Sequence, residues 1–264
     1  MFNNYLILKL LLAPLIIMAG TLVSRRWGGK IGGLMIGLPL TSAPVSIFFT
    51  IEQGRSFATR AAVGAILGLI AVSVFCVTYA QVARRFPWYA AAAAGVFLYL
   101  ASVWAISLIN PGIWLTAILV PCVLALALLS LKSFEIKEVP ILYPRWDLPL
   151  RMFIATFILI LITSAANFLG PKWSGLLSPF PIFTFVMVTF SHHQAGPDAA
   201  WRFIDGVLTG LFGYIAFFLV VALSLERVNP ILVYSLATLA ALGVNGTSLA
   251  RVVWRNRAAH VAGL

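Results

Sequence analysis

The sequence predicts an all-α polytopic membrane protein with about nine transmembrane helices. Three observations lead to this class: 62% of the 264 residues are hydrophobic, only 9% are charged, and the mean hydropathy is +1.03. An ordinary soluble domain carries roughly a quarter charged residues. The composition therefore excludes a soluble enzyme, a secreted disulfide scaffold and a disordered chain.

Apolar runs long enough to cross a bilayer follow one another along the chain, since a spanning helix needs roughly 17 to 25 such residues. We expect nine helices, at 5–23, 31–50, 61–80, 88–109, 112–131, 149–169, 174–191, 202–224 and 231–250. The longest connection, 132–147, carries prolines and mixed charges and lies near the middle of the chain. The expected domains are a first membrane repeat, a linking helix with a cytoplasmic linker, and a second repeat with a short tail: 1–110, 111–148 and 149–264.

The positive charges predict the orientation. With nine crossings, 13 of the 18 Lys and Arg residues fall on one side of the membrane and 5 on the other. Because cytoplasmic loops carry an excess of Lys and Arg, we place the richer side in the cytoplasm, the N-terminus outside and the C-terminus inside. This bias accounts for the basic pI of 10.3 and leaves no basic stripe for a nucleic-acid partner.

The chain resembles itself at an offset of 142 residues. Residues 30–80 and 172–222 are identical at 13 of 51 positions, including the glycine pair Gly54 and Gly196. Five spans separate the starts of the two copies, so we predict two inverted repeats of four helices joined by a linking helix. Inverted repeats are typical of secondary transporters, which expose one central site to either side in turn. A duplication in a channel or a membrane-embedded enzyme is the alternative.

The second and seventh predicted spans are broken by prolines, Pro39 in one copy and Pro181 in the other. Proline removes a backbone donor and clashes with the preceding turn. Lipid cannot satisfy the freed backbone groups, so paired broken helices indicate a buried or water-lined binding site. We expect the substrate site to consist of these prolines and the nearby hydroxyl residues, which are Thr41, Ser42, Ser46 and Thr184. Kinked helices whose hydroxyls bond to their own backbone are the alternative.

Basic residues flank both broken helices. Lys30 and Arg60 flank the first, and Lys172 and Arg202 flank the second. We assign all four to substrate binding, which predicts an anionic substrate. Snorkelling to lipid phosphate is the alternative for the cytoplasmic pair, Lys30 and Arg202. Pairing with Glu52 and Asp198 is the alternative for the outer pair, Arg60 and Lys172.

Two carboxylates are assigned to proton coupling, Asp205 and Glu52. An intramembrane carboxylate is costly in its charged form, so its protonation couples readily to a conformational change. A local ion pair at the helix N-terminus is the alternative for Asp205. Asp147 falls in the linker and receives no role.

The sequence predicts no catalytic residues, no metal site and no cofactor. It contains no GxSxG, HExxH or nucleotide-binding loop. The adjacent His192 and His193 would point about 100° apart on a helix, so they rarely bind one metal together. The GxxxG spacings at Gly64 and Gly206 favour close helix packing within the chain, and a homodimer is left open.

The stretch GLLSPFPIFTFVMVTFSHH at 175–193 resembles the GlpM-like family of small bacterial inner-membrane proteins, whose members share a GL, P, FP, F pattern before an aromatic or histidine-containing helix end. GGLMIGLPLTS at 32–42 is similar to a variant of that motif. The chain is about twice the family's length, as in a tandem duplication. The resemblance implies a bacterial inner-membrane location and a link to envelope metabolism.

These observations favour a secondary transporter for a small, anionic metabolite, coupled to protons and working by alternating access. A flippase or permease for a phosphate-bearing envelope lipid carrier is the second hypothesis. A membrane-embedded enzyme or a channel is the third. The expected partners are therefore a small or lipid-linked substrate and membrane lipid.

Overall fold

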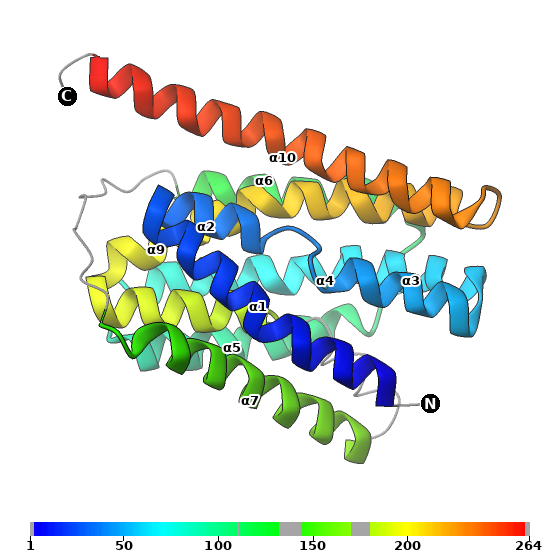
Figure 1. The fold of residues 1–264 in the computed structure, drawn as a ribbon, viewed down its shortest axis with the longest axis horizontal. Helices are drawn as coiled ribbons and strands as arrows, with labels where there is room; N and C mark the ends of the chain where they lie inside the picture. The colour runs from blue at the N-terminus through cyan, green and yellow to red at the C-terminus, as the bar shows by residue number, and fades with distance from the viewer. Residues whose placement is uncertain (1–2, 110, 132–143, 170–179, 262–264) are drawn as a thin grey trace.

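The computed structural model describes residues 3–109, 111–131, 144–169 and 180–261, and this part of the chain is all-helical. Its helices lie roughly along one long axis (Figure 1). In chain order they are α1 (Asn3–Trp27), α2 (Gly29–Ile36), α3 (Ser42–Gln53), α4 (Arg55–Val82), α5 (Trp88–Ile106), α6 (Ile113–Leu131), α7 (Asp147–Leu169), α9 (Ile182–Ser224) and α10 (Pro230–Val261).

Five helices among the described residues are long and apolar enough to cross a membrane: α4, α5, α6, α9 and the first 21 residues of α10. The prediction of an all-α membrane protein is confirmed at this level. The count of nine spans stays a prediction. α1 starts at one end of the molecule and α10 finishes at the opposite end (Figure 1), as an odd number of crossings requires.

The break predicted in the second span is present. α2 ends at Ile36 and α3 begins at Ser42, and the buried Pro39 lies between them. The Pro39 carbonyl accepts a hydrogen bond of 2.9 Å from the amide of Ala43, which starts the second half-helix. In the other copy, α9 begins directly after Pro181. Residues 170–179, which include Lys172, lie outside the described residues.

Two sharp corners occur at Gly54 and Gly196. Gly54 joins α3 to α4 with φ 87° and ψ 168°, and Gly196 turns the chain inside α9 with φ 81° and ψ −176°. Residues with a Cβ rarely adopt such positive φ values, so glycine is needed at both places. The corners are 142 residues apart and lie at opposite ends of the molecule (Figure 1). Equal corners at opposite ends are what inverted copies would produce.

α2 and the second part of α9 pack with their backbones in direct contact. A Cβ on Gly33 would overlap the backbone of Phe203, and one on Gly206 would overlap the backbone of Lys30. A Cβ on Gly37 would lie 2.6 Å from the carbonyl of Val207. The predicted intrachain packing of the GxxxG at Gly206 is therefore confirmed. We call this contact the glycine seam.

Candidate functional site: a cavity between broken helices

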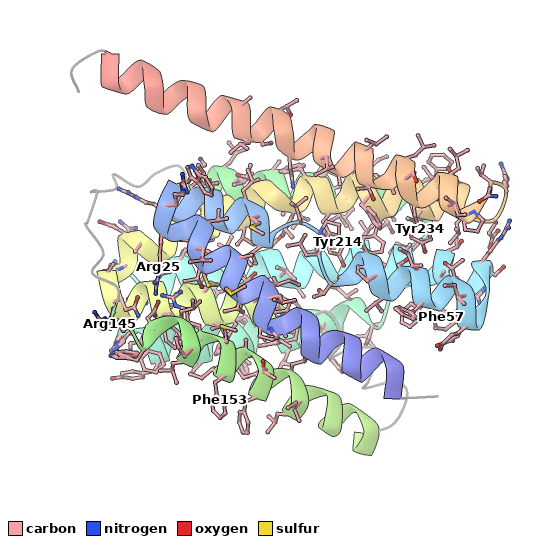
Figure 2. All side chains as sticks on the ribbon, in the orientation of Figure 1. Arg25, Phe57, Arg145, Phe153, Tyr214 and Tyr234 are labelled. Atoms are coloured by element: carbon pink, nitrogen blue, oxygen red, sulfur yellow. The ribbon has the colours of Figure 1, made fainter. Side chains whose placement is uncertain are left out.

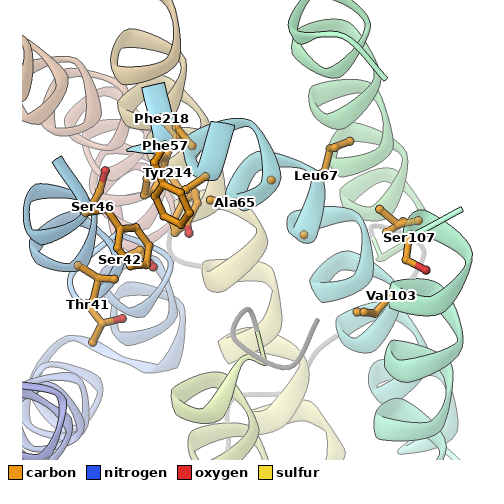
Figure 3. Close-up of a pocket in the computed structure, with 17 residues that line it drawn as sticks. Thr41, Ser42, Ser46, Phe57, Ala65, Leu67, Val103, Ser107, Tyr214 and Phe218 are labelled. Atoms are coloured by element: carbon orange, nitrogen blue, oxygen red, sulfur yellow. The ribbon is translucent and has the colours of Figure 1, made fainter. Parts of the chain in front are cut away.

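A cavity of about 460 Å³ lies between α3, α4, α5 and α9 (Figure 3). Thr41, Ser42 and Ser46 line one wall, beside Tyr214 of α9, and Ser107 lies on the far wall at the end of α5. The volume falls in the range of about 300–1,000 Å³ that is usual for small-molecule sites.

A smaller cavity of about 150 Å³ shares Thr41, Ser42 and Tyr214 with the larger one. One wall is formed by the break between α2 and α3, and another by residues 180–184 at the start of α9. The break at Pro39 and the start of α9 at Pro181 therefore meet in one place. Both segments belong to the substrate site that the sequence predicts from Pro39 and Pro181.

The structure brings most of the predicted neutral residues together. Thr41 and Ser42 line both cavities, Ser46 lines the larger one, and Pro181 and the buried Thr184 line the smaller one. Pro39 is buried inside the break, between residues that line the smaller cavity.

Ser46 is also held by α10. The hydroxyl of Tyr234 donates to the Ser46 carbonyl at 2.8 Å, so the Ser46 hydroxyl, at 2.9 Å, donates to the Tyr234 oxygen. The Thr50 hydroxyl lies 2.8 Å from the same oxygen. These bonds attach α10 to α3 at a residue that lines the larger cavity. Tyr234 thus positions a cavity wall.

The predicted charged residues lie elsewhere. Lys30 on α2 forms an ion pair of 2.5 Å with Asp205 on α9, next to the glycine seam. Arg60 and Glu52 are exposed, and Arg202 is half-buried. None of these five lines either cavity as the described residues define it. A local ion pair is the alternative for Asp205, and the structure pairs it with Lys30, which lies on another helix.

Sequence reasoning missed Tyr214, which lines both cavities from α9. Its hydroxyl lies within the otherwise apolar stretch 210–223 of a predicted span, and this isolation is the signal that could have identified it. A tyrosine hydroxyl at such a depth usually finds a hydrogen-bond partner.

A second missed feature is a buried charge network at the end of the molecule where Arg25 and Arg145 lie (Figure 2). The Asp147 side chain is fully buried and Arg151 is 1% exposed. Arg25 donates to one Asp147 oxygen at 2.7 Å, and Arg151 donates to the other at 2.8 Å. Gln194 donates to Asp147 and accepts a 3.0 Å hydrogen bond from Arg151. We call these four residues the Asp147 network.

The Asp147 network joins α1, α7 and the first part of α9. The Arg151 guanidinium also lies 4.8 Å from the ring centroid of Phe190 and contacts the Met187 sulfur at 3.4 Å. The i, i+4 spacing of Asp147 and Arg151 was the signal available in the sequence. Contrary to the sequence interpretation, Asp147 therefore has a structural role.

Asp147 precedes the predicted span at 149–169 and is charged in this network. Burial alone would raise the pKa of its carboxyl, but the hydrogen bonds and charge of Arg151 and the hydrogen bonds of Arg25 and Gln194 outweigh burial. Together they hold the pKa below its usual range.

The fold and these two features define an all-helical protein with membrane-spanning helices, a central cavity beside a broken helix, and a buried charge network at one end. Comparisons with protein-family models, with curated proteins and with solved structures give no match for this chain.

Proposed function

We propose that this protein is a secondary transporter that works by alternating access between inverted repeats. The observation that carries the proposal is the smaller cavity, where the break between α2 and α3 meets the start of α9. Interrupted helices free backbone groups that a membrane-embedded protein can satisfy only in protein or in a wet cavity. Paired interruptions at one cavity are the arrangement used by many transporters to bind substrate.

The larger cavity and the Asp147 network lie towards opposite ends of the molecule, and this arrangement supports a state in which the site is closed at one end. The larger cavity lies in the half of the molecule towards the α3–α4 corner, where Phe57 lies (Figure 2). The Asp147 network ties α1, α7 and α9 together at the opposite end. We assign that end to the cytoplasm, because the sequence places most Lys and Arg residues there. The structure then corresponds to a state that is closed towards the cytoplasm.

Proton coupling fits the same scheme. Protonation of Asp205 would release Lys30 from the ion pair beside the glycine seam. Asp205 therefore stays the carboxylate that we assign to coupling, with Glu52 as the second. A bacterial inner-membrane location and a GlpM-like ancestry are part of the proposal.

The test is the accessibility of the cavity from each side of the membrane. Ser42→Cys and Ala65→Cys would be made singly in a chain without Cys76 and Cys122, and labelled with a membrane-impermeant thiol reagent in right-side-out and inverted vesicles. We expect labelling from both sides. Arg25→Gln, which weakens the Asp147 network, is expected to increase labelling from the cytoplasmic side and decrease it from the other. Ala105→Cys, exposed on α5, is the control for reagent entry through lipid.

Labelling from one side alone, in both the starting chain and the Arg25→Gln variant, would refute alternating access. A parallel increase on both sides would indicate a channel. The inverted repeat itself is tested by Ser56→Cys and Ala199→Cys in intact cells, where only the first is expected to react.

A further inference from the structure

We propose that the larger cavity binds an uncharged amphipathic molecule with an apolar body and one hydrogen-bonding group, an inference that rests on the proposed transport function. The sequence predicted an anion because basic residues flank the broken helices. The cavity walls indicate different chemistry. Their described residues are aliphatic, aromatic or hydroxyl-bearing.

The apolar part of the ligand would lie against aromatic rings. Phe49 and Phe57 meet edge to face with centroids 5.2 Å apart, and Tyr214 and Phe218 are 4.7 Å apart. All four rings belong to residues that line the cavity. Such paired rings give a rigid apolar surface against which an apolar body can pack.

The polar part of the ligand would lie at the inner end, where the larger cavity meets the smaller one. Thr41, Ser42 and Tyr214 each present a hydroxyl there (Figure 3). Hydroxyls both donate and accept, so they suit an alcohol, carbonyl or amide. Burying a carboxylate or ammonium beside neutral hydroxyls is costly without an opposite charge. The described lining offers no such charge.

The ligand has a route to the site. Phe57, Gly64 and Ser107 line the cavity and are exposed at the molecular surface. Their positions put the opening on the side away from the Asp147 network. A ligand entering there would meet the aromatic rings first and the hydroxyls last.

The test uses two photoactivatable probes that differ in charge: a diazirine-bearing octanol and the matching octanoate. Each is irradiated with the full-length protein in lipid nanodiscs, and labelled residues are mapped by mass spectrometry. We expect saturable labelling of α3 and α4 by the octanol probe, prevented by excess unlabelled octanol. The octanoate is expected to label these segments about tenfold less, which is a difference of about 1.4 kcal/mol.

Matched variants locate the site. Ala65 lines both cavities and Ala105 is exposed on α5. Ala65→Trp is expected to abolish saturable labelling because it fills the cavity, whereas Ala105→Trp is expected to leave it unchanged. Ser42→Ala and Tyr214→Phe keep the shape of the wall and are each expected to weaken labelling by about two- to tenfold.

Preference for octanoate, unsaturable labelling, or full labelling of Ala65→Trp would each refute the proposal. Competition by a soluble alcohol alone supports a solute as the neutral ligand, and competition by diacylglycerol supports a membrane lipid. Cysteine accessibility is an independent measurement. Saturable octanol labelling in a protein that is accessible from one side only would refute transport but support the binding site proposed here. Accessibility from both sides together with a preference for octanoate would support transport and refute this binding site.

Discussion

Replacing Asp147 with asparagine should destabilise this protein strongly, because the carboxylate holds two guanidinium groups. Asp147 is fully buried and Arg151 is 1% exposed. Removing one partner of a buried ion pair costs about 3–5 kcal/mol, since the other charge is left uncompensated. Arg25 and Arg151 would also face each other across a neutral amide. For a chain of this size, such a loss lowers Tm by an amount on the order of 10 °C.

The assay follows thermal unfolding in detergent through Cys76, which is 0% exposed and becomes reactive to a thiol dye when the core opens. Cys122 is exposed and would be replaced by alanine to remove its background. Asp205→Asn is the matched control. Its partner Lys30 has a side chain that is 37% exposed, so solvent screening reduces the expected loss to about 1 kcal/mol or less.

Equal Tm values for Asp147→Asn and Asp205→Asn would refute the reasoning, because burial would then not decide the cost of the lost charge. A double variant separates charge from packing. Asp147→Leu combined with Arg151→Met replaces the two fully buried charges by apolar side chains, an exchange that is often neutral, and only the partly exposed Arg25 then lacks the Asp147 carboxylate. We expect the double variant to be more stable than Asp147→Asn alone.

Further predictions concern pH, helix packing and buried hydroxyls. The pKa of the Asp147 carboxyl is lowered in the folded state. Its contribution to stability is therefore present above the unfolded pKa of about 4 and is lost as the pH falls through the folded pKa. The Tm difference between the native chain and Asp147→Asn should hold from neutral pH to about pH 5 and shrink in stronger acid. Gly206→Ala should prevent folding or sharply lower the yield of monodisperse protein, since its Cβ would overlap the Lys30 backbone, whereas Gly246→Ala on α10 meets nothing within 4 Å and should be tolerated. Tyr234→Phe loses hydrogen bonds to α3 and should cost about 1–3 kcal/mol in the same unfolding assay. Tyr99→Phe should be neutral or stabilising, because the buried Tyr99 hydroxyl has no partner among the described residues.

The neutral part of the site could be predicted from sequence because its cause is local. A proline in the interior of a helix removes a backbone hydrogen bond and favours a break there, as at Pro39, although α1 and α6 continue through Pro14 and Pro121. Hydroxyls within a turn of that break, such as Ser42, necessarily lie near it. The sequence also marks the corner at Gly54, because Gly54 matches Gly196 in the repeat. Both glycines have a positive φ in the structure, which explains why the same residue type occurs at both corners.

The charged part could not be predicted in the same way, because closeness along the chain is not closeness in space. Lys30 precedes the break by most of α2, which is 8 residues or roughly 12 Å long. Arg60 follows it by all of α3, which is 12 residues or roughly 18 Å. Both residues therefore lie towards the ends of the molecule. Asp147 forms an ion pair with Arg25, which is 122 residues away in the sequence. Only the tertiary fold brings these two residues together.

The glycine seam limits which parts of the molecule can move. With carbonyls and α-carbons of α2 and α9 in contact at Gly33, Gly37, Gly206 and Gly210, neither helix can slide along the other without steric overlap. The two helices are therefore expected to move together as one rigid body. In the transport cycle that we propose, rocking motions would then occur about the ends of this unit, at the loop before α3 and at the corner of Gly196. A flexible residue pair at the Gly196 corner, which lines neither cavity, would change the rate of that proposed cycle and leave ligand affinity unaltered.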